Sequence, residues 1–112
     1  MREYPLADTA LARRIERTGV NDLCSWADDA RETGVYPDAA SFRVAGGGAV
    51  WFSTGNVVNG SFGLGMERPV EHEEVAALVA FFAERDAPAT VDVCPHADAS
   101  LLRWLAETGF LV

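Results

Sequence analysis

The chain has 112 residues, a length typical of one compact domain, so we expect residues 1–112 to form a single domain. Its nine basic residues are all arginine and face 17 acidic ones, which gives a net charge of −8. Nucleic acids and anionic membranes bind basic protein surfaces, so this charge argues against both as partners. The longest apolar run, residues 75–83, has about half of the ~18 residues that a membrane span needs. Residues 1–5 contain no apolar signal core, so we expect a cytoplasmic protein.

The first third of the chain predicts two helices. Apolar residues recur at helical spacing from Leu6 to Ile15, with charged residues between them. Gly19 interrupts this pattern, and Asn21 is placed to cap a second helix whose apolar stripe falls at positions 23, 27 and 30. Gly34 and the proline at position 37 end that second helix.

The middle third predicts antiparallel strands. Residues 41–45 and 49–53 alternate like strands, and the glycines at 46–48 between them are typical of a hairpin turn. Residues 57–64 form a third predicted strand, which Gly60 and Gly63 weaken.

The last third alternates helix and strand. We expect a helix over 72–85, a strand over 89–94, and a helix that Asp98 caps and Gly109 ends. Residues 110–112 resemble the start of another strand. A strand, a helix and a strand from 57 to 94 predict a right-handed parallel crossover. The predicted class is therefore α+β with a mixed sheet.

Short motifs along the chain follow an order that is similar to that of the GNAT acyltransferase superfamily. They are Ala-Arg-Arg-Ile-Glu at 12–16, Val-Ala-Gly-Gly at 44–47, Asn59 with Phe-Gly-Leu-Gly at 62–65, Phe-Phe-Ala-Glu-Arg at 81–85 with Ala-Pro at 87–88, Cys-Pro at 94–95 with Ala-Asp at 97–98, and the closing helix at 101–110, which ends in Gly-Phe. The chain most closely resembles the amino-terminal half of bacterial two-part GNAT-family N-acetyltransferases. The resemblance implies a GNAT-like mixed sheet flanked by helices that lacks the last strands of the fold.

The resemblance also implies a cofactor and a reaction. GNAT enzymes transfer an acyl group from acetyl-CoA or another acyl-CoA to an amine. The cofactor lies between two splayed parallel strands, and its pyrophosphate meets main-chain N–H groups at the following helix. The corresponding loop makes Phe62, Gly63, Leu64 and Gly65 the cofactor-binding candidates. Gly60 stands where the family usually has arginine or glutamine, and residues 66–71 separate the loop from the helix it should open.

Charge argues against acetyl-CoA binding by this chain. Four glutamates, at positions 67, 71, 73 and 74, crowd the amino-terminal end of the predicted 72–85 helix. At ~7 Å and an effective dielectric constant near 40, each carboxylate costs roughly 1 kcal/mol against a phosphate. An exposed helix end attracts an anion by only ~0.3–1 kcal/mol. We therefore predict that the loop does not hold acetyl-CoA.

The remaining motifs carry little chemistry. Asn59 and Arg68 are the polar candidates for a substrate site, with turn and surface roles as the alternative. Ser61 is near a nucleophile-elbow pattern but falls within a predicted strand. A strand face could bring together Asp92, Cys94 and His96, but a proline at position 95 breaks it, so no metal site is predicted.

Two functions follow from the resemblance. In the first, the chain is a non-catalytic GNAT-like half that packs on a second GNAT domain and shapes the substrate side of its cleft. In the second, it is a complete small acyl-CoA-dependent N-acetyltransferase that works as a homodimer and uses residues 62–65 for the cofactor. Neither the acceptor amine nor a general base is assigned in either case.

Overall fold

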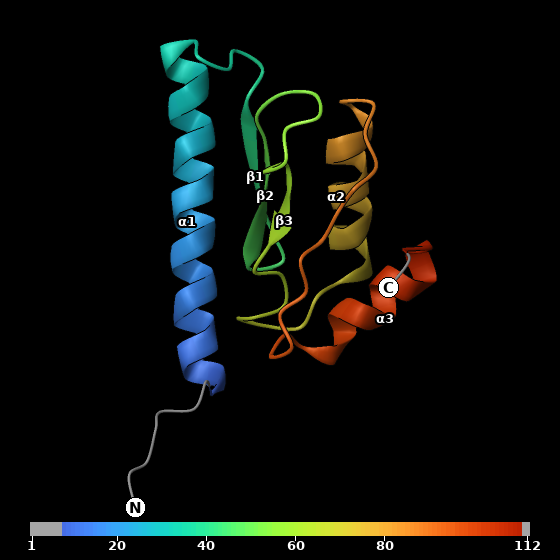
Figure 1. Cartoon of the computed structure of the whole chain (residues 1–112). Helices are drawn as coiled ribbons and strands as arrows, with labels where there is room; N and C mark the ends of the chain where they lie inside the picture. Colours follow the sequence, from blue (N-terminus) through green and yellow to red (C-terminus); the bar gives the residue numbers. More distant parts are fainter. Residues whose placement is uncertain (1–7, 111–112) are drawn as a thin grey trace, which may run out of the picture.

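The computed structural model describes residues 8–110, which form three helices and one three-stranded antiparallel sheet. In chain order these are α1 (Thr9–Thr33), β1 (Ala40–Val44), β2 (Gly47–Trp51), β3 (Gly60–Phe62), α2 (His72–Ala83) and α3 (Ala99–Thr108). The sheet has the order β1-β2-β3, with α1 along one side and α2 along the other (Figure 1). The α+β class is thus confirmed. No helix within residues 8–110 is both long enough and apolar enough to cross a membrane.

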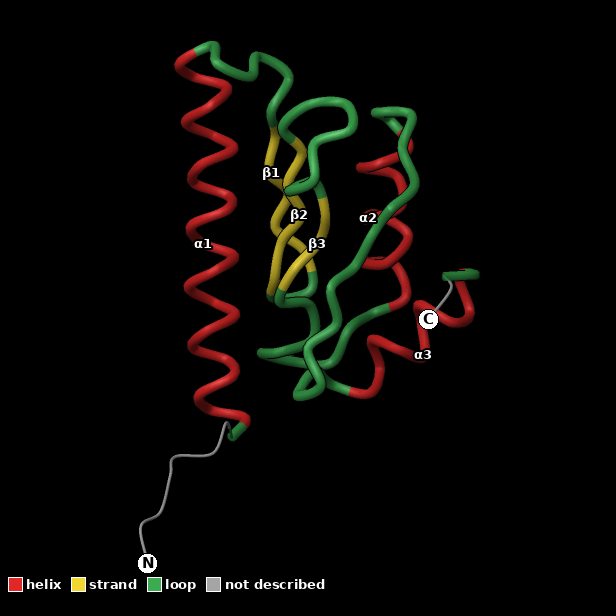
Figure 2. Tube along the Cα trace, in the orientation of Figure 1, coloured by secondary structure: helices red, strands yellow, loops and turns green. Residues whose placement is uncertain are grey.

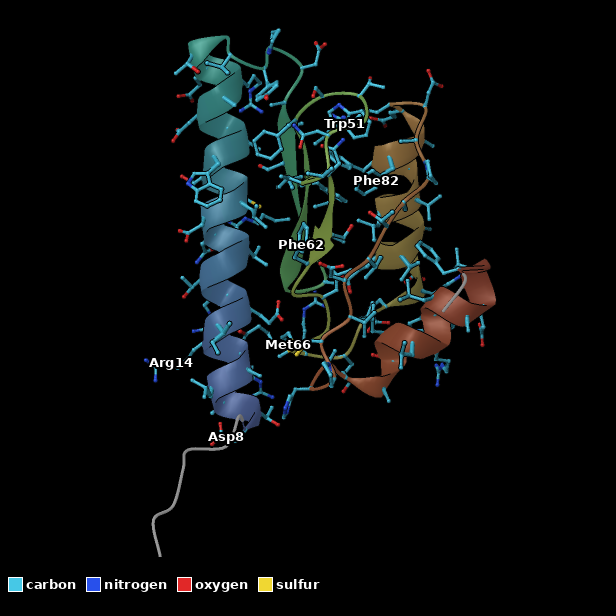
Figure 3. All side chains as sticks on the ribbon, in the orientation of Figure 1. Asp8, Arg14, Trp51, Phe62, Met66 and Phe82 are labelled. Atoms are coloured by element: carbon cyan, nitrogen blue, oxygen red, sulfur yellow. The ribbon has the colours of Figure 1, made fainter. Side chains whose placement is uncertain are left out.

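Each side of the sheet carries its own apolar cluster. On one side, α1 packs Val20, Cys24 and Ala27 against Val50 of β2. On the other side, α2 covers the sheet and α3 packs against α2, and the rings of Trp51 and Phe82 meet edge to face with centroids 6.4 Å apart (Figure 3). The sheet is therefore the middle layer between two helical layers.

The first helix corrects the prediction of two helices. Gly19 and Asn21 both lie inside one continuous 25-residue helix. Val20, Cys24 and Ala27 recur at helical spacing and are buried against the sheet, and this packing outweighs the cost of about 1 kcal/mol for a helical glycine. Asn21 accepts a hydrogen bond from Arg43 (Nη1 to Oδ1, 2.8 Å), so its side chain bonds β1. The predicted end is confirmed, because Gly34 is the left-handed C-cap.

The hairpin is confirmed, but its turn is one residue earlier and shorter than predicted. Ala45 and Gly46 both have positive φ, 54° and 77°, as a two-residue type I′ turn requires. Gly47 and Gly48 belong to β2. A Cβ on Gly47 would lie 2.3 Å from the carbonyl oxygen of Phe62, so this glycine allows β2 and the end of β3 to approach closely.

The third and fourth predicted strands are much shorter in the structure. β3 covers only Gly60–Phe62, because residues before it form a hydrogen-bonded loop and Gly63 turns away with a φ of 71°. Within the predicted strand 89–94, Val91 alone forms a bridge, which is parallel and joins Ser61. The named strands are therefore all antiparallel, and the expected parallel pairing is a single bridge in a segment that Figure 2 draws as loop. Prolines at 88 and 95 bracket this segment and limit its ladder.

The last two helices lie close to the predicted bounds. α2 begins at His72 as expected and ends at Ala83, two residues before the predicted end. α3 has Asp98 as its N-cap and Gly109, with a φ of 96°, as its C-cap. The predicted strand at 110–112 starts with Phe110, whose N–H instead donates to Leu105 of α3 (3.0 Å). Residues 111–112 lie outside the described residues.

Candidate functional site

The candidate site is the segment of residues 63–71 between β3 and α2, here called the 63–71 loop. It contains three of the four cofactor candidates, Gly63, Leu64 and Gly65, followed by residues 66–71, which separate them from α2. Its first part is buried: Leu64 is 2% exposed, and both Gly63 and Gly65 have positive φ. The N–H of Gly65 donates to the carbonyl of Ala45 (3.1 Å), and the carbonyl of Gly65 accepts from the N–H of Asp98 (2.8 Å). The loop is thus bonded to the β1–β2 turn on one side and to the start of α3 on the other.

Two arginines of α1 hold the middle of the loop. Arg13 donates through Nε to the carbonyl oxygen of Met66 at 2.7 Å. Met66 is itself 3% exposed and lies between the start of α1 and the start of α3 (Figure 3). One turn further along α1, Arg17 pairs with the carboxylate of Glu67 at 2.7 Å.

Helix α3 holds the end of the loop through both main-chain groups of Val70. The N–H of Val70 donates to Ser100 Oγ at 2.7 Å, and its carbonyl accepts from Trp104 Nε1 at 2.8 Å. Val70 is 3% exposed, so both groups lie away from water. Sequence reasoning missed these contacts, because they join residues about thirty positions apart that share no local motif.

Glu74 brings its carboxylate back over the amino-terminal end of α2. It accepts hydrogen bonds from the N–H of Ala45 (2.7 Å) and from the N–H of Glu71 (3.0 Å), and Arg68 donates to both of its oxygens at 2.7 Å. The hydrogen bonds from Arg68 lower the pKa of Glu74 from 4.5 to about 2, helped by those from Glu71 and Ala45 and opposed by partial burial. An internal anion therefore lies at the helix end to which the resemblance assigns the pyrophosphate.

The charges around the start of α2 are arranged differently from the prediction. That prediction set Arg68 against the four glutamates as a group, whereas two of the glutamates have arginine partners of their own: Glu67 pairs with Arg17 and Glu74 with Arg68. These pairs offset much of the predicted repulsion. The obstacle to a phosphate is instead the Glu74 carboxylate itself, which already accepts hydrogen bonds from the N–H groups of Ala45 and Glu71.

The two segments that should spread apart around a cofactor are bonded to each other. The N–H of Asp92 donates to the carbonyl of Ser61 at 2.9 Å, beside the parallel bridge between Ser61 and Val91. A Cβ on Gly60 would lie 3.3 Å from Thr90 Oγ1, so the segments also approach closely one residue earlier. Further along, the bond from Asp98 to Gly65 joins them again. The space between residues 61–65 and residues 92–98 is therefore closed by a hydrogen bond at each end.

The two substrate candidates are engaged in structural contacts. Asn59 accepts from the N–H of Phe52 (2.8 Å) and donates through Nδ2 to the carbonyl of Ser53 (2.7 Å), so its amide closes the loop between β2 and β3. Arg68 is bound to Glu74. Of the cofactor candidates, Phe62 packs with the cluster beneath α1 (Figure 3), away from the hydrogen bonds of Glu74.

The other motifs do not converge. Ser61 is confirmed as a strand residue and is fully buried. Among residues 8–110, no three His, Cys, Asp or Glu side chains are placed to hold a metal ion. His96 instead lies beside Thr9, with 3.3 Å between Nδ1 and Oγ1.

No family model matches the chain, and neither a curated protein nor a solved structure matches it.

Proposed function

We propose that this chain is a non-catalytic GNAT-like half of a two-part N-acetyltransferase. In this proposal it packs against a partner domain that binds acetyl-CoA and transfers the acetyl group to an amine. Its order of elements supports the idea: a long helix, three antiparallel strands, a helix, an extended segment of residues 88–93 that is bridged in parallel to β3, and a further helix. The two free thiols, Cys24 and Cys94, suit a cytoplasmic location for this work.

The observation that carries the non-catalytic role is the carboxylate of Glu74. A pyrophosphate bound at a helix start needs free N–H groups and an electropositive surrounding. Here the N–H groups of Ala45 and Glu71 and both ends of the Arg68 guanidinium are directed at Glu74. A phosphate that used these groups would have to break all four hydrogen bonds and displace the carboxylate. The internal carboxylate thus takes the role of the ligand and stabilises the loop without one.

The hydrogen bonds that join β3 and the residues after it to the extended segment support the same conclusion. A pantetheine arm would need to enter between Ser61 and Asp92, which are hydrogen-bonded. Opening that bond would also disturb Ser61, which is fully buried. We therefore assign the chain a structural role on the substrate side, where its net charge of −8 would attract a cationic amine.

Titration with acetyl-CoA tests this proposal. The indole of Trp104 bonds the 63–71 loop, so tryptophan fluorescence reports on that loop, and the melting temperature reports on binding anywhere. We expect neither signal to change up to millimolar acetyl-CoA. A saturable change would overturn the non-catalytic role and favour a complete small acetyltransferase, since a ligand at a hundredfold its Kd adds about 2.7 kcal/mol of stability.

A further inference from the structure

The extended segment of residues 88–93 is paired along one edge only. The N–H of Asp92 points to β3, where it donates to Ser61. Successive residues of an extended segment direct their main-chain groups to opposite edges. The N–H and C=O groups of Val91 and Val93 therefore face away from β3, and within residues 8–110 neither N–H has a hydrogen-bond acceptor. This side of the segment is an open strand edge.

An apolar groove of about 660 Å³ lies along that edge. Its floor and far wall come from α2 and α3, through residues such as Val79, Leu102 and Leu105. Val93 and Leu102 on its rim are 38% and 45% exposed, which is high for large apolar side chains. An occupant must therefore satisfy main-chain hydrogen bonds and fill an apolar space at once. An extended polypeptide does both.

We propose that this occupant is the same edge of a second copy of the chain, antiparallel across a two-fold axis. Like edges produce a closed dimer, whereas pairing two different edges produces open chains of molecules. The sheet's other edge is β1, which carries the exposed and charged Arg43, and charged side chains protect a strand edge from pairing. The 88–93 edge has valines at the positions whose main-chain groups face outward.

The register follows from two prolines and one carboxylate. Prolines at positions 88 and 95 cannot donate to a ladder, so the pairing must centre between them. If Val91 faces Val91, the outward groups of both copies exchange hydrogen bonds, and Thr90 faces Asp92. If the centre moved to Asp92, two carboxylates would face each other, which is destabilising. We therefore assign the register in which Val91 lies opposite its own copy.

Sedimentation velocity from micromolar to millimolar chain tests the dimer. Two molecules of net charge −8 repel each other, so we expect the dimer fraction to rise with added salt. Val93→Pro removes an outward N–H and leaves the bond from Asp92 to Ser61 in place, so it should give a folded monomer. Val93→Ala keeps that N–H and should remain dimeric. A monomeric wild-type chain at all concentrations, or a dimer that Val93→Pro leaves intact, would overturn the proposal.

Cross-linking tests the register and does not depend on a proline variant that folds. In a Cys94→Ser background, Val91→Cys places two thiols on a directly opposed pair with Cα atoms about 5.5 Å apart, within disulfide range. We expect oxidation to give a covalent dimer. Val93→Cys is the matched control, because its two copies would lie roughly 14 Å apart, four residues along the strands. Cross-linking of Val93→Cys but not Val91→Cys would refute the register. None of these results depends on acetyl-CoA, so the dimer and the proposed function can fail separately.

Discussion

Glu74 Oε2 lies 2.7 Å from the main-chain nitrogen of Ala45, and this hydrogen bond joins the first turn of α2 to the tip of the β1–β2 hairpin. The carbonyl of Ala45 also accepts from Gly65, so one turn residue contacts both ends of the connection from β3 to α2. The left-handed φ of 54° at Ala45 belongs to the type I′ turn that presents these two groups. The hairpin turn is therefore part of the candidate site, although it lies some twenty residues earlier in the chain.

Glu74→Gln should lower the stability of the chain and change its dependence on pH. The substitution removes the charge that Arg68 and two main-chain N–H groups bind, and hydrogen bonds to a charged group contribute about 2 kcal/mol. Because folding lowers the pKa of this carboxyl from 4.5 to about 2, its contribution is complete above pH 4.5 and is lost as the pH falls to 2. Urea unfolding of both proteins at several pH values measures this.

The difference between wild type and Glu74→Gln is the quantity to follow, because other carboxyls also titrate in this range. That difference should be largest near neutral pH and shrink between pH 4.5 and 2. Glu73→Gln is a matched control on the same turn of α2, with an exposed side chain that makes no ion pair within residues 8–110. A constant difference at all pH values would contradict the role assigned to the Glu74 carboxylate.

Glu74→Ala should create a weak anion site where the wild-type chain has none. Without the carboxylate, Arg68 and the N–H groups of Ala45 and Glu71 would face an empty space at the start of α2. We expect inorganic pyrophosphate to raise the melting temperature of this variant at millimolar concentration and to leave the wild type unchanged. Adding Arg68→Ala should abolish the gain. A variant that is folded and unaffected by pyrophosphate would show that this loop does not resemble a phosphate-binding loop in its chemistry.

Local signals predicted the elements whose ends are decided locally. Asp98 and Gly109 bound α3 as expected, since a cap depends on the residue itself and its neighbours within a turn. The continuity of α1 through Gly19 could not be predicted in this way, because it rests on burial of Val20 and Cys24 against strands that come later in the chain. Helix propensity is a weak preference, and tertiary packing reverses it.

In the candidate site, too, local signals could be predicted from the sequence and long-range contacts could not. The sequence predicted cofactor candidates at 62–65 and acidic surroundings at the start of the next helix, but that prediction gave the four glutamates the same weight. Glu71 and Glu74 have the spacing at which an N3 glutamate bonds back to the N-cap N–H, and this local signal could have singled out Glu74. No comparable signal exists for Ser100 and Trp104, which reach Val70 only once α3 has packed beside α2.

Two serine-to-alanine substitutions should have opposite effects. Ser61 is fully buried, and among the described residues its hydroxyl has no hydrogen-bond partner, so Ser61→Ala should leave stability unchanged or raise it by up to about 1 kcal/mol. Ser100 Oγ accepts from the buried N–H of Val70, so Ser100→Ala should lower stability by about 1–2 kcal/mol. Urea unfolding measures both. A marked loss of stability in Ser61→Ala would indicate that its hydroxyl has a partner, such as a bound water molecule.

A pair of glycine-to-alanine substitutions tests the packing of the hairpin against the 63–71 loop. At Gly47 a Cβ would lie 2.3 Å from the carbonyl oxygen of Phe62 and 2.5 Å from the carbonyl carbon of Gly63, and both are main-chain atoms that cannot rotate away. Gly47→Ala must therefore separate β2 from the end of β3, at a cost of about 3 kcal/mol or more. Gly19 lies on the exposed side of α1 with nothing within 4 Å of a Cβ, so Gly19→Ala should raise stability by about 0.5–1 kcal/mol. Chemical unfolding of the two variants measures both effects, and a Gly47→Ala protein as stable as the wild type would refute the close approach of these strands. Because Gly47 is next to the turn that supplies Ala45, its variant should also weaken the bond to Glu74 and reduce the loss of stability between pH 4.5 and 2.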